Sequence, residues 1–146
     1  MRFRLATTED LKIIKSWLKE EFDRSGTGNG FYNNTNLIEE GQKRGELTVA
    51  IDNKDNLPVA FYLGNGCSAE ILEVRPDYRG KGIGRLFVEH IIKCAKNKGY
   101  PAISGFCCPE ESLPFWLKMG FKRTGNWVKF NVSTKSDENT TCCGYG

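Results

Sequence analysis

The segment from Ser68 to Lys98 constrains the fold more than any other part of this chain of 146 residues. Its residues predict a strand that ends at Val74, a glycine-rich turn from Arg79 to Gly84, and a long amphipathic helix. Glycine at every second position lets the backbone of the turn bend tightly and come close to a ligand. A helix that begins inside this turn exposes unpaired N–H groups at the positive end of its dipole. The sequence therefore predicts a cradle for a phosphate group.

Two common glycine loops that bind phosphate do not fit this turn. A dinucleotide-binding G-x-G-x-x-G loop that starts at Gly80 needs a third glycine at the position of Arg85. A P-loop needs Lys followed by Ser or Thr behind a glycine, and the turn lacks that pair. The pattern that fits is R-x-x-G-x-G, formed by Arg79, Gly82 and Gly84.

With the preceding residues L-E-V-R-P-D-Y, this pattern resembles the acetyl-CoA-binding motif of the GNAT superfamily of N-acetyltransferases. A second run, F-W-L-K-M-G-F from Phe115 to Phe121, is similar to the F-Y-x-x-x-G-F signature of the same family. The resemblance implies an acyltransferase with acetyl-CoA as its cosubstrate. Such an enzyme would move the acetyl group to a primary amine by direct transfer in a ternary complex.

The resemblance also implies which residues hold the cofactor. The exposed backbone of Leu72 to Val74 would imitate a sheet partner for the pantetheine amides, and N–H groups near Val74 would form a small oxyanion hole. The turn from Gly80 to Arg85 would hold the pyrophosphate. The expected cofactor-binding residues are Leu72, Glu73, Val74, Arg79, Gly80, Lys81, Gly82, Ile83, Gly84 and Arg85.

A proton acceptor is required because an alkyl amine has a reference pKa near 10 and arrives protonated. With a period of two, Ser68, Glu70, Leu72 and Val74 share one face of their strand, and the resemblance implies that this face looks toward the acceptor. Glu70 is therefore the expected general base, and Val74 completes the catalytic pair through its backbone. Glu73 points to the other face unless a bulge intervenes. The alternative is that Glu70 is only a solvated strand residue.

The second signature departs from the family at Trp116, where many relatives place a Tyr that protonates the departing thiolate. An indole N–H donates a hydrogen bond but is not an acid in this pH range. The thiolate would then leave unprotonated, take a proton from water, or take one from the thiol of Cys107 or Cys108. A second hypothesis is a non-catalytic regulatory protein that binds acyl-CoA.

The acceptor is not identified by the sequence beyond a small-molecule or peptide amine. Phe31 and Tyr32 lie within a Gly- and Asn-rich segment, residues 25–36, that predicts a loop. These two rings are the candidate substrate-binding residues, as a wall of the acceptor pocket, although packing against the core is the commoner role of aromatic residues.

Composition narrows the class of protein further. The length predicts one domain over residues 1–132, followed by a polar, disordered tail over residues 133–146. A net charge of +3 without a basic run argues against nucleic-acid binding. No apolar stretch is long enough for a membrane span, and no secretory signal is apparent at the N-terminus.

Six cysteines without a C-x-x-C pair, and one His, predict reduced thiols, no metal site and a cytoplasmic location. The chain would be a monomer or a homodimer.

The expected fold class is α/β (α+β), as a GNAT-like single domain. Its central sheet would be mixed, mostly antiparallel, with about six to seven strands, about four helices and splayed central strands. Strands are expected at residues 2–6, 46–51, 59–63, 68–74, 102–108, 121–124 and 127–132. Helices are expected from Thr7 or Thr8 to near Arg24, at residues 37–44, from the turn to Lys98, and at residues 109–119. A turn is expected at residues 64–66.

Overall fold

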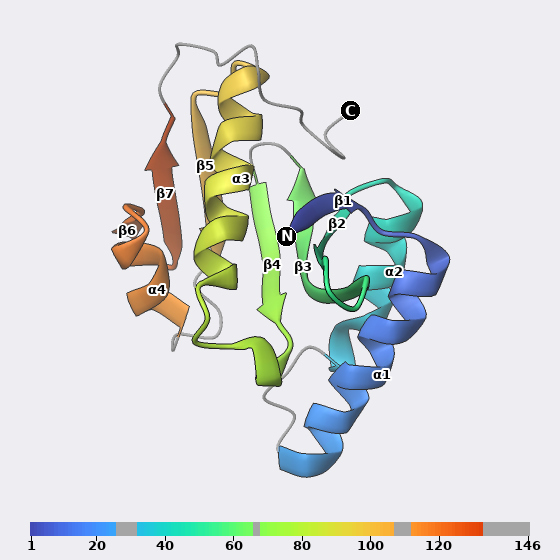
Figure 1. Ribbon diagram of the computed structural model, residues 1–146. Coiled ribbons are helices and arrows are strands. Elements are labelled where there is room, and N and C mark those ends of the chain that lie inside the picture. The colour runs from blue at the N-terminus through green and yellow to red at the C-terminus, as the bar shows by residue number, and fades with distance from the viewer. Residues whose placement is uncertain (26–31, 66–67, 107–111, 133–146) are drawn as a thin grey trace.

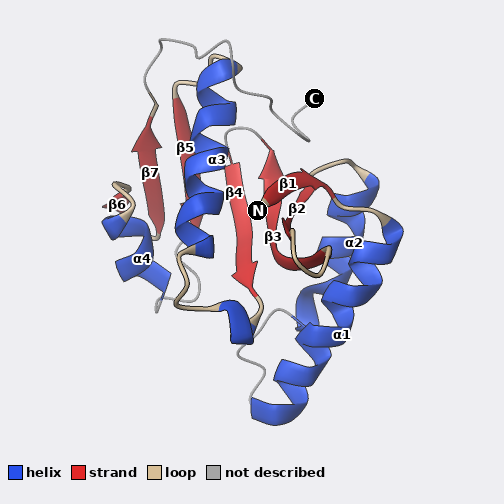
Figure 2. Ribbon diagram, viewed as in Figure 1, coloured by secondary structure: helices blue, strands red, loops and turns tan. Residues whose placement is uncertain are grey.

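The fold is a seven-stranded sheet with helices on both faces, seen in a computed structural model that describes residues 1–25, 32–65, 68–106 and 112–132 (Figures 1 and 2). The strand order is β1-β2-β3-β4-β5-β7-β6, and neighbouring strands are antiparallel except β4 and β5. The predicted mixed, mostly antiparallel sheet is thereby confirmed.

The strands are β1 (Arg2–Leu5), β2 (Leu47–Asp52), β3 (Leu57–Asn65), β4 (Ser68–Val74), β5 (Ala102–Phe106), β6 (Lys122–Thr124) and β7 (Trp127–Asn131). The helices are α1 (Thr8–Ser25), α2 (Thr35–Lys43), α3 (Ile83–Asn97) and α4 (Leu113–Lys118), with 3-10 turns η1 (Tyr32–Asn34) and η2 (Pro76–Tyr78). Within these described residues, no helix combines the length and apolarity needed to cross a membrane.

The sheet separates two hydrophobic clusters, because successive side chains of a strand point to opposite faces. On one face, the apolar side of α3 packs with Ala60 and Tyr62 of β3. On the other face, α1 and α2 pack with Phe61 and Leu63 of the same strand. We call these the α3 side and the α1 side of the sheet. Figure 1 shows α3 crossing the sheet near β4 and β5, whereas α1 and α2 lie beyond β3.

The side chains of Thr7 and Asp10 cap the start of α1. The backbone N–H of Asp10 donates to Thr7 Oγ1 at 3.1 Å, and the backbone N–H of Thr7 donates to Asp10 Oδ2 at 2.8 Å. This reciprocal pair satisfies amide groups that the first turn of the helix would otherwise leave unbonded.

Several predicted boundaries are wrong. Gly64 and Asn65 continue β3 instead of forming a turn, and α2 begins two residues earlier than expected, at Thr35. The 3-10 turn η2, which separates β4 from the glycine turn, was not expected. Residues 107–111 and the predicted tail at residues 133–146 lie outside the described residues.

The central strands splay apart as expected. Strand β4 pairs with β5 only through Ser68 opposite Ser104 and Ala69 opposite Gly105. The rest of β4, as far as Val74, has no partner in β5, while β5 continues along β7. Within the part of the chain that the structure describes, one side of the β4 backbone is therefore free of sheet pairing from Glu70 onward.

A β-bulge at Glu70 changes which way the end of β4 faces. Leu63 of β3 lies opposite Ile71, but Gly64 lies opposite Ala69, so Glu70 is an extra residue without a partner in β3. Ala69 belongs to the α3 side and Ile71 to the α1 side, although they are two residues apart.

The prediction that Ser68, Glu70, Leu72 and Val74 share one face is therefore wrong. Leu72 and Val74 pack on the α3 side, opposite Tyr62 and Ala60 of β3. Glu73 lies opposite Phe61, which is a member of the α1-side cluster. The sequence did not decide whether a bulge interrupts this strand. Because the bulge is present, the carboxylate of Glu73 points toward α1.

The space around Gly64 admits no side chain, so we expect Gly64→Ala to disturb the pairing at the bulge. A Cβ at this position would lie 2.2 Å from the carbonyl oxygen of Ser68 and 2.6 Å from the Tyr62 hydroxyl, which donates to that same oxygen. We expect the free energy of unfolding to fall by about 2 kcal/mol, as in other overpacked sites. Denaturant titration measures the loss, and an unchanged midpoint would show that the strands relax around the methyl group at no cost.

Candidate active site

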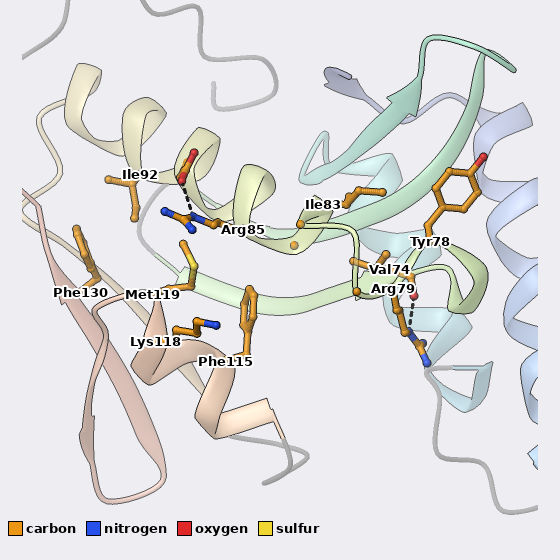
Figure 3. A pocket seen from close by; sticks show the side chains of 14 residues that line it. Val74, Tyr78, Arg79, Ile83, Arg85, Ile92, Phe115, Lys118, Met119 and Phe130 are labelled. Carbon is orange, nitrogen blue, oxygen red and sulfur yellow. Dashed lines mark hydrogen bonds and ion pairs between the residues drawn. The ribbon is translucent and has the colours of Figure 1, made fainter.

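A cleft of about 780 Å³ lies where the start of α3, the end of β4, α4 and β7 meet (Figure 3). Its size is typical of sites that bind small molecules. Its lining is Val74, Tyr78, Arg79, Gly80, Gly82, Ile83, Gly84, Arg85, Glu89, Ile92, Phe115, Lys118, Met119 and Phe130. Seven of the ten expected cofactor-binding residues belong to this lining, and Leu72, Glu73 and Lys81 do not.

The glycine turn forms the end of the cleft. Gly80 and Gly82 have φ angles of 77° and 82°, which side chains rarely adopt, and a Cβ at either position would meet no described atom within 4 Å. Gly82 is the N-cap of α3 and supplies no side chain to cap it. The first amide groups of α3 therefore face open space at the positive end of the helix dipole.

Gly84 serves a different purpose from the other two glycines of the turn. A Cβ there would come within 3.2 Å of the Phe115 ring. The missing side chain lets the first turn of α3 approach α4 closely, so this glycine sets the width of the cleft.

Basic side chains come from both walls of the cleft. Figure 3 shows Arg85 of α3 and Lys118 of α4 on opposite sides of it. Arg85 Nε donates to Glu89 Oε1 at 3.1 Å. Lys81 lies outside the lining, with its ammonium 5.0 Å from the centre of the Tyr78 ring. The helix start and these cations together make the cleft suitable for an anionic ligand.

Arg79 does not point into the cleft as a phosphate ligand would. Its Nε donates to the carbonyl oxygen of Val74 at 2.8 Å, and its Nη2 lies 3.2 Å from each carboxylate oxygen of Glu21 on α1. The same nitrogen forms an ion pair with Glu73. The guanidinium thereby joins β4 to α1, turned away from Arg85 and Lys118 (Figure 3).

Glu73 has an unusual environment for a carboxylate. Its side chain is 13% exposed, and that of Glu21 is 15% exposed. The pKa of Glu73 is raised to about 7, chiefly by burial and also by the nearby charge of Glu21, while Arg79 acts to lower it. Glu21, 58 residues away from Arg79, carries no local sequence signal that links it to the site.

The other expected site residues lie elsewhere. Glu70 is exposed at the bulge. Tyr32 packs on Phe22 of α1 with ring centres 5.3 Å apart, which is the packing role named as the alternative in the sequence analysis.

Trp116 of the second signature is buried, with its ring edge-on to Phe121 and the ring centres 5.0 Å apart. The neighbouring Phe115, and not Trp116, lines the cleft. Phe31, Cys107 and Cys108 lie outside the described residues.

A second hollow, of about 440 Å³, lies between α1 and the turn at Arg75–Asp77. Arg75 and Asp77 form a two-bonded ion pair at 2.6 and 2.7 Å. Glu21 lines this hollow, and its partner Arg79 lines the cleft. The cluster of Glu21, Glu73 and Arg79 therefore lies between the two.

The raised pKa of Glu73 predicts a pH-dependent penalty on stability. The folded chain holds this proton more tightly than the unfolded chain, in which the pKa is about 4.5, so the free energy of unfolding falls as pH rises from about 4.5 through 7. Glu73→Gln removes the penalty. We expect the difference in unfolding free energy, variant minus wild type, to grow by about 2 to 3 kcal/mol between pH 5 and pH 8.

Urea titrations across this pH range would measure the difference, with the exposed Glu70→Gln as the matched strand control. A Glu73→Gln difference that stays constant with pH would mean that Glu73 is already ionised below pH 5.

Comparison with known proteins identifies the family. The chain matches the model of the acetyltransferase (GNAT) domain over residues 37–123. It is 34% identical over 91 residues to the peptidyl-lysine N-acetyltransferase YjaB of Salmonella typhimurium, which covers 61% of this chain and 59% of that relative. It is 37% identical over 81 residues to YjaB of Escherichia coli, covering 54% and 51%. The match thus spans between half and three-fifths of the length of these curated relatives.

Solved structures show the same fold. The solution structure of apo YjaB from Escherichia coli superposes with a TM-score of 0.63 at 24% identity, covering 88% of this chain and 94% of that one. The PaiA N-acetyltransferase of Thermoplasma acidophilum, solved in complex with coenzyme A, gives 0.69 at 16% identity, with 89% and 98% covered. The family model, which spans more than half of the chain and includes both signatures, shows that this protein belongs to the GNAT family of acetyltransferases.

Proposed function

We propose that this protein is an N-acetyltransferase that transfers the acetyl group of acetyl-CoA directly to a primary amine. The observation that carries the proposal is the start of α3, which opens on the cleft without a capping side chain, with Gly80 and Gly82 at positive φ. This arrangement favours an anion held by backbone amides, as the pyrophosphate of coenzyme A would be.

The remaining parts of the cofactor would extend from this point along the cleft. The pyrophosphate would lie on the backbone from Gly80 to Arg85, with Arg85 and Lys118 as nearby cations. The pantetheine would pair with the backbone of Leu72 to Val74, because this stretch of β4 has no partner in β5. The apolar rings of Phe115 and Phe130 supply surface for the uncharged parts of the molecule.

The reaction makes three demands on the protein. The thioester must be held near the amine, and the cleft would position it. The carbonyl oxygen gains charge during attack, and backbone N–H groups near Val74 would stabilise that charge. The amine must lose a proton before it attacks, and β4 supplies two carboxylates for this role, Glu70 at the bulge and Glu73 beyond it.

The departing thiolate receives no proton from Trp116 in this proposal, because that indole is packed in the core instead of lining the cleft. Coenzyme A would leave as the thiolate and take its proton from water or from the newly acylated nitrogen. A thiol of Cys107 or Cys108 as the acid stays a prediction from the sequence.

The relatives suggest the class of acceptor. Both YjaB proteins are named peptidyl-lysine N-acetyltransferases. We therefore propose the ε-amino group of lysine in a peptide or protein as the acceptor.

Two glycines that flank α3 offer a matched test of the phosphate cradle. Gly82→Asp places a carboxylate at the start of the helix, and Gly99→Asp places one just past its end, where φ is 76° and no described atom lies within 4 Å of the new Cβ. Both variants meet a similar backbone strain. By calorimetry, we expect Gly82→Asp to weaken acetyl-CoA binding at least tenfold, about 1.4 kcal/mol, and Gly99→Asp to leave it near wild type.

Equal affinity in the two variants would remove the start of α3 from the binding site. Release of free thiol from acetyl-CoA in the presence of lysine peptides then tests the chemistry. Tight binding without turnover would favour the alternative of a regulatory protein that binds acyl-CoA.

A further inference from the structure

Three charged side chains from separate parts of the chain meet beside the cleft. Glu21 comes from α1, Glu73 from β4, and Arg79 from the turn between η2 and α3. Arg79 Nη2 contacts both oxygens of Glu21 at 3.2 Å and also pairs with Glu73. One guanidinium thus serves two largely buried carboxylates, so that one negative charge has no partner among the described residues when both are ionised.

The neighbouring charges do not cancel this excess. In the hollow beside the cluster, Arg75 and Asp77 neutralise each other in a two-bonded pair. The other charged residues of its described lining are Glu20 and Arg24, of opposite sign on one helix. Among the described residues, the cluster and the lining of the hollow together hold four carboxylates and three guanidinium groups, and a single positive charge would balance them.

The cluster lies beside the stretch of β4 at which the thioester would be held. Glu21 faces the hollow, and Val74, the residue next to Glu73, lines the cleft and accepts a hydrogen bond from Arg79. A group that entered from the hollow and reached Glu73 would therefore approach the same stretch of β4 that would hold the thioester. The pairing of Glu73 with Phe61 keeps its carboxylate on the α1 side, opposite Leu72 and Val74.

On the premise that the proposed function is correct, we propose that Glu21 and Glu73 form the binding site for the acceptor's primary ammonium group, and that Glu73 takes its proton. The N–H bond breaks and the carboxylate gains the proton, which frees the nitrogen lone pair. The lone pair forms the C–N bond with the thioester carbonyl carbon, and the C–S bond breaks to release coenzyme A as thiolate. The second proton leaves the nitrogen for the thiolate or for water, which completes the amide.

The protonation of Glu73 fits this role. Burial first, and then the charge of Glu21, raise its pKa to about 7, against the opposing effect of Arg79. The carboxyl is therefore a stronger base than a solvated glutamate and is half ionised near neutral pH. Because only the carboxylate accepts a proton, the rate should rise with pH through about 7.

The test compares kcat/KM from pH 5.5 to 9 for five proteins: wild type and the variants Glu73→Gln, Glu21→Gln, Glu70→Gln and Glu9→Gln. The substrates are acetyl-CoA and N-terminally blocked hexapeptides with one lysine each. Acetyl-CoA affinity, measured by calorimetry, shows that each variant is folded. Glu9 is an exposed residue at the far end of α1 and serves as the matched control.

We expect a wild-type profile with a rising limb near pH 7. Glu73→Gln should lower kcat/KM at pH 8 at least a hundredfold and remove that limb, while acetyl-CoA binds as before. Glu21→Gln should raise the KM for the peptide about tenfold. It should also move the limb to lower pH, because it removes a charge that raises the pKa of Glu73. Glu9→Gln should match wild type.

Each contrary result has a distinct meaning. Turnover by the wild type, together with an unchanged limb in Glu73→Gln or an unmoved limb in Glu21→Gln, would overturn the assignment of this pair and leave the acetyltransferase proposal standing. Loss of the limb in Glu70→Gln instead would return the proton-accepting role to the bulge residue. Failure of the wild type to bind acetyl-CoA, or to acetylate any amine, would overturn both proposals.

Discussion

The arrangement of the site depends on how β4 pairs with β3. One unpaired residue, Glu70, interrupts the alternation of β4, so that its final residues face the opposite way from a regular strand. The same strand also loses β5 as a partner beyond Ala69. Among the residues that the structure describes, these two irregularities leave a strand whose backbone is open on one edge and whose Glu73 side chain reaches α1. A regular strand in this position would offer neither feature.

The cluster of Glu21, Glu73 and Arg79 is a poor device for stability. Burial of two carboxylates costs desolvation free energy, and the attraction of a single guanidinium offsets only part of that cost. Two apolar side chains in place of Glu73 and Glu21 would avoid this desolvation cost. Apolar packing is already present on this face, where the rings of Phe61 and Trp17 lie 5.8 Å apart. Perturbed ionisable groups of this kind gather at functional sites. The cluster is thus the part of the molecule whose chemistry the fold alone does not explain.

Much of the fold was predictable because its signals are local. Apolar spacing and glycine positions located α3, and the position of the cleft followed from the same turn. The side-chain directions were not predictable in this way. The bulge at Glu70 depends on the register with Gly64 and Leu63 of another strand. The direction of the Arg79 side chain depends on Glu21, which is remote in the chain, so the motif indicated a glycine-rich turn but not where this side chain lies.

The contact between Gly84 and Phe115 ties together the two sequence signatures of the chain. Gly84 ends the first signature and Phe115 begins the second, and the gap between them has no room for even a methyl group without movement of the ring. Neither position is therefore free to change by itself. During evolution a larger residue at one would require a smaller one at the other, so the two motifs should be inherited as a single unit of packing.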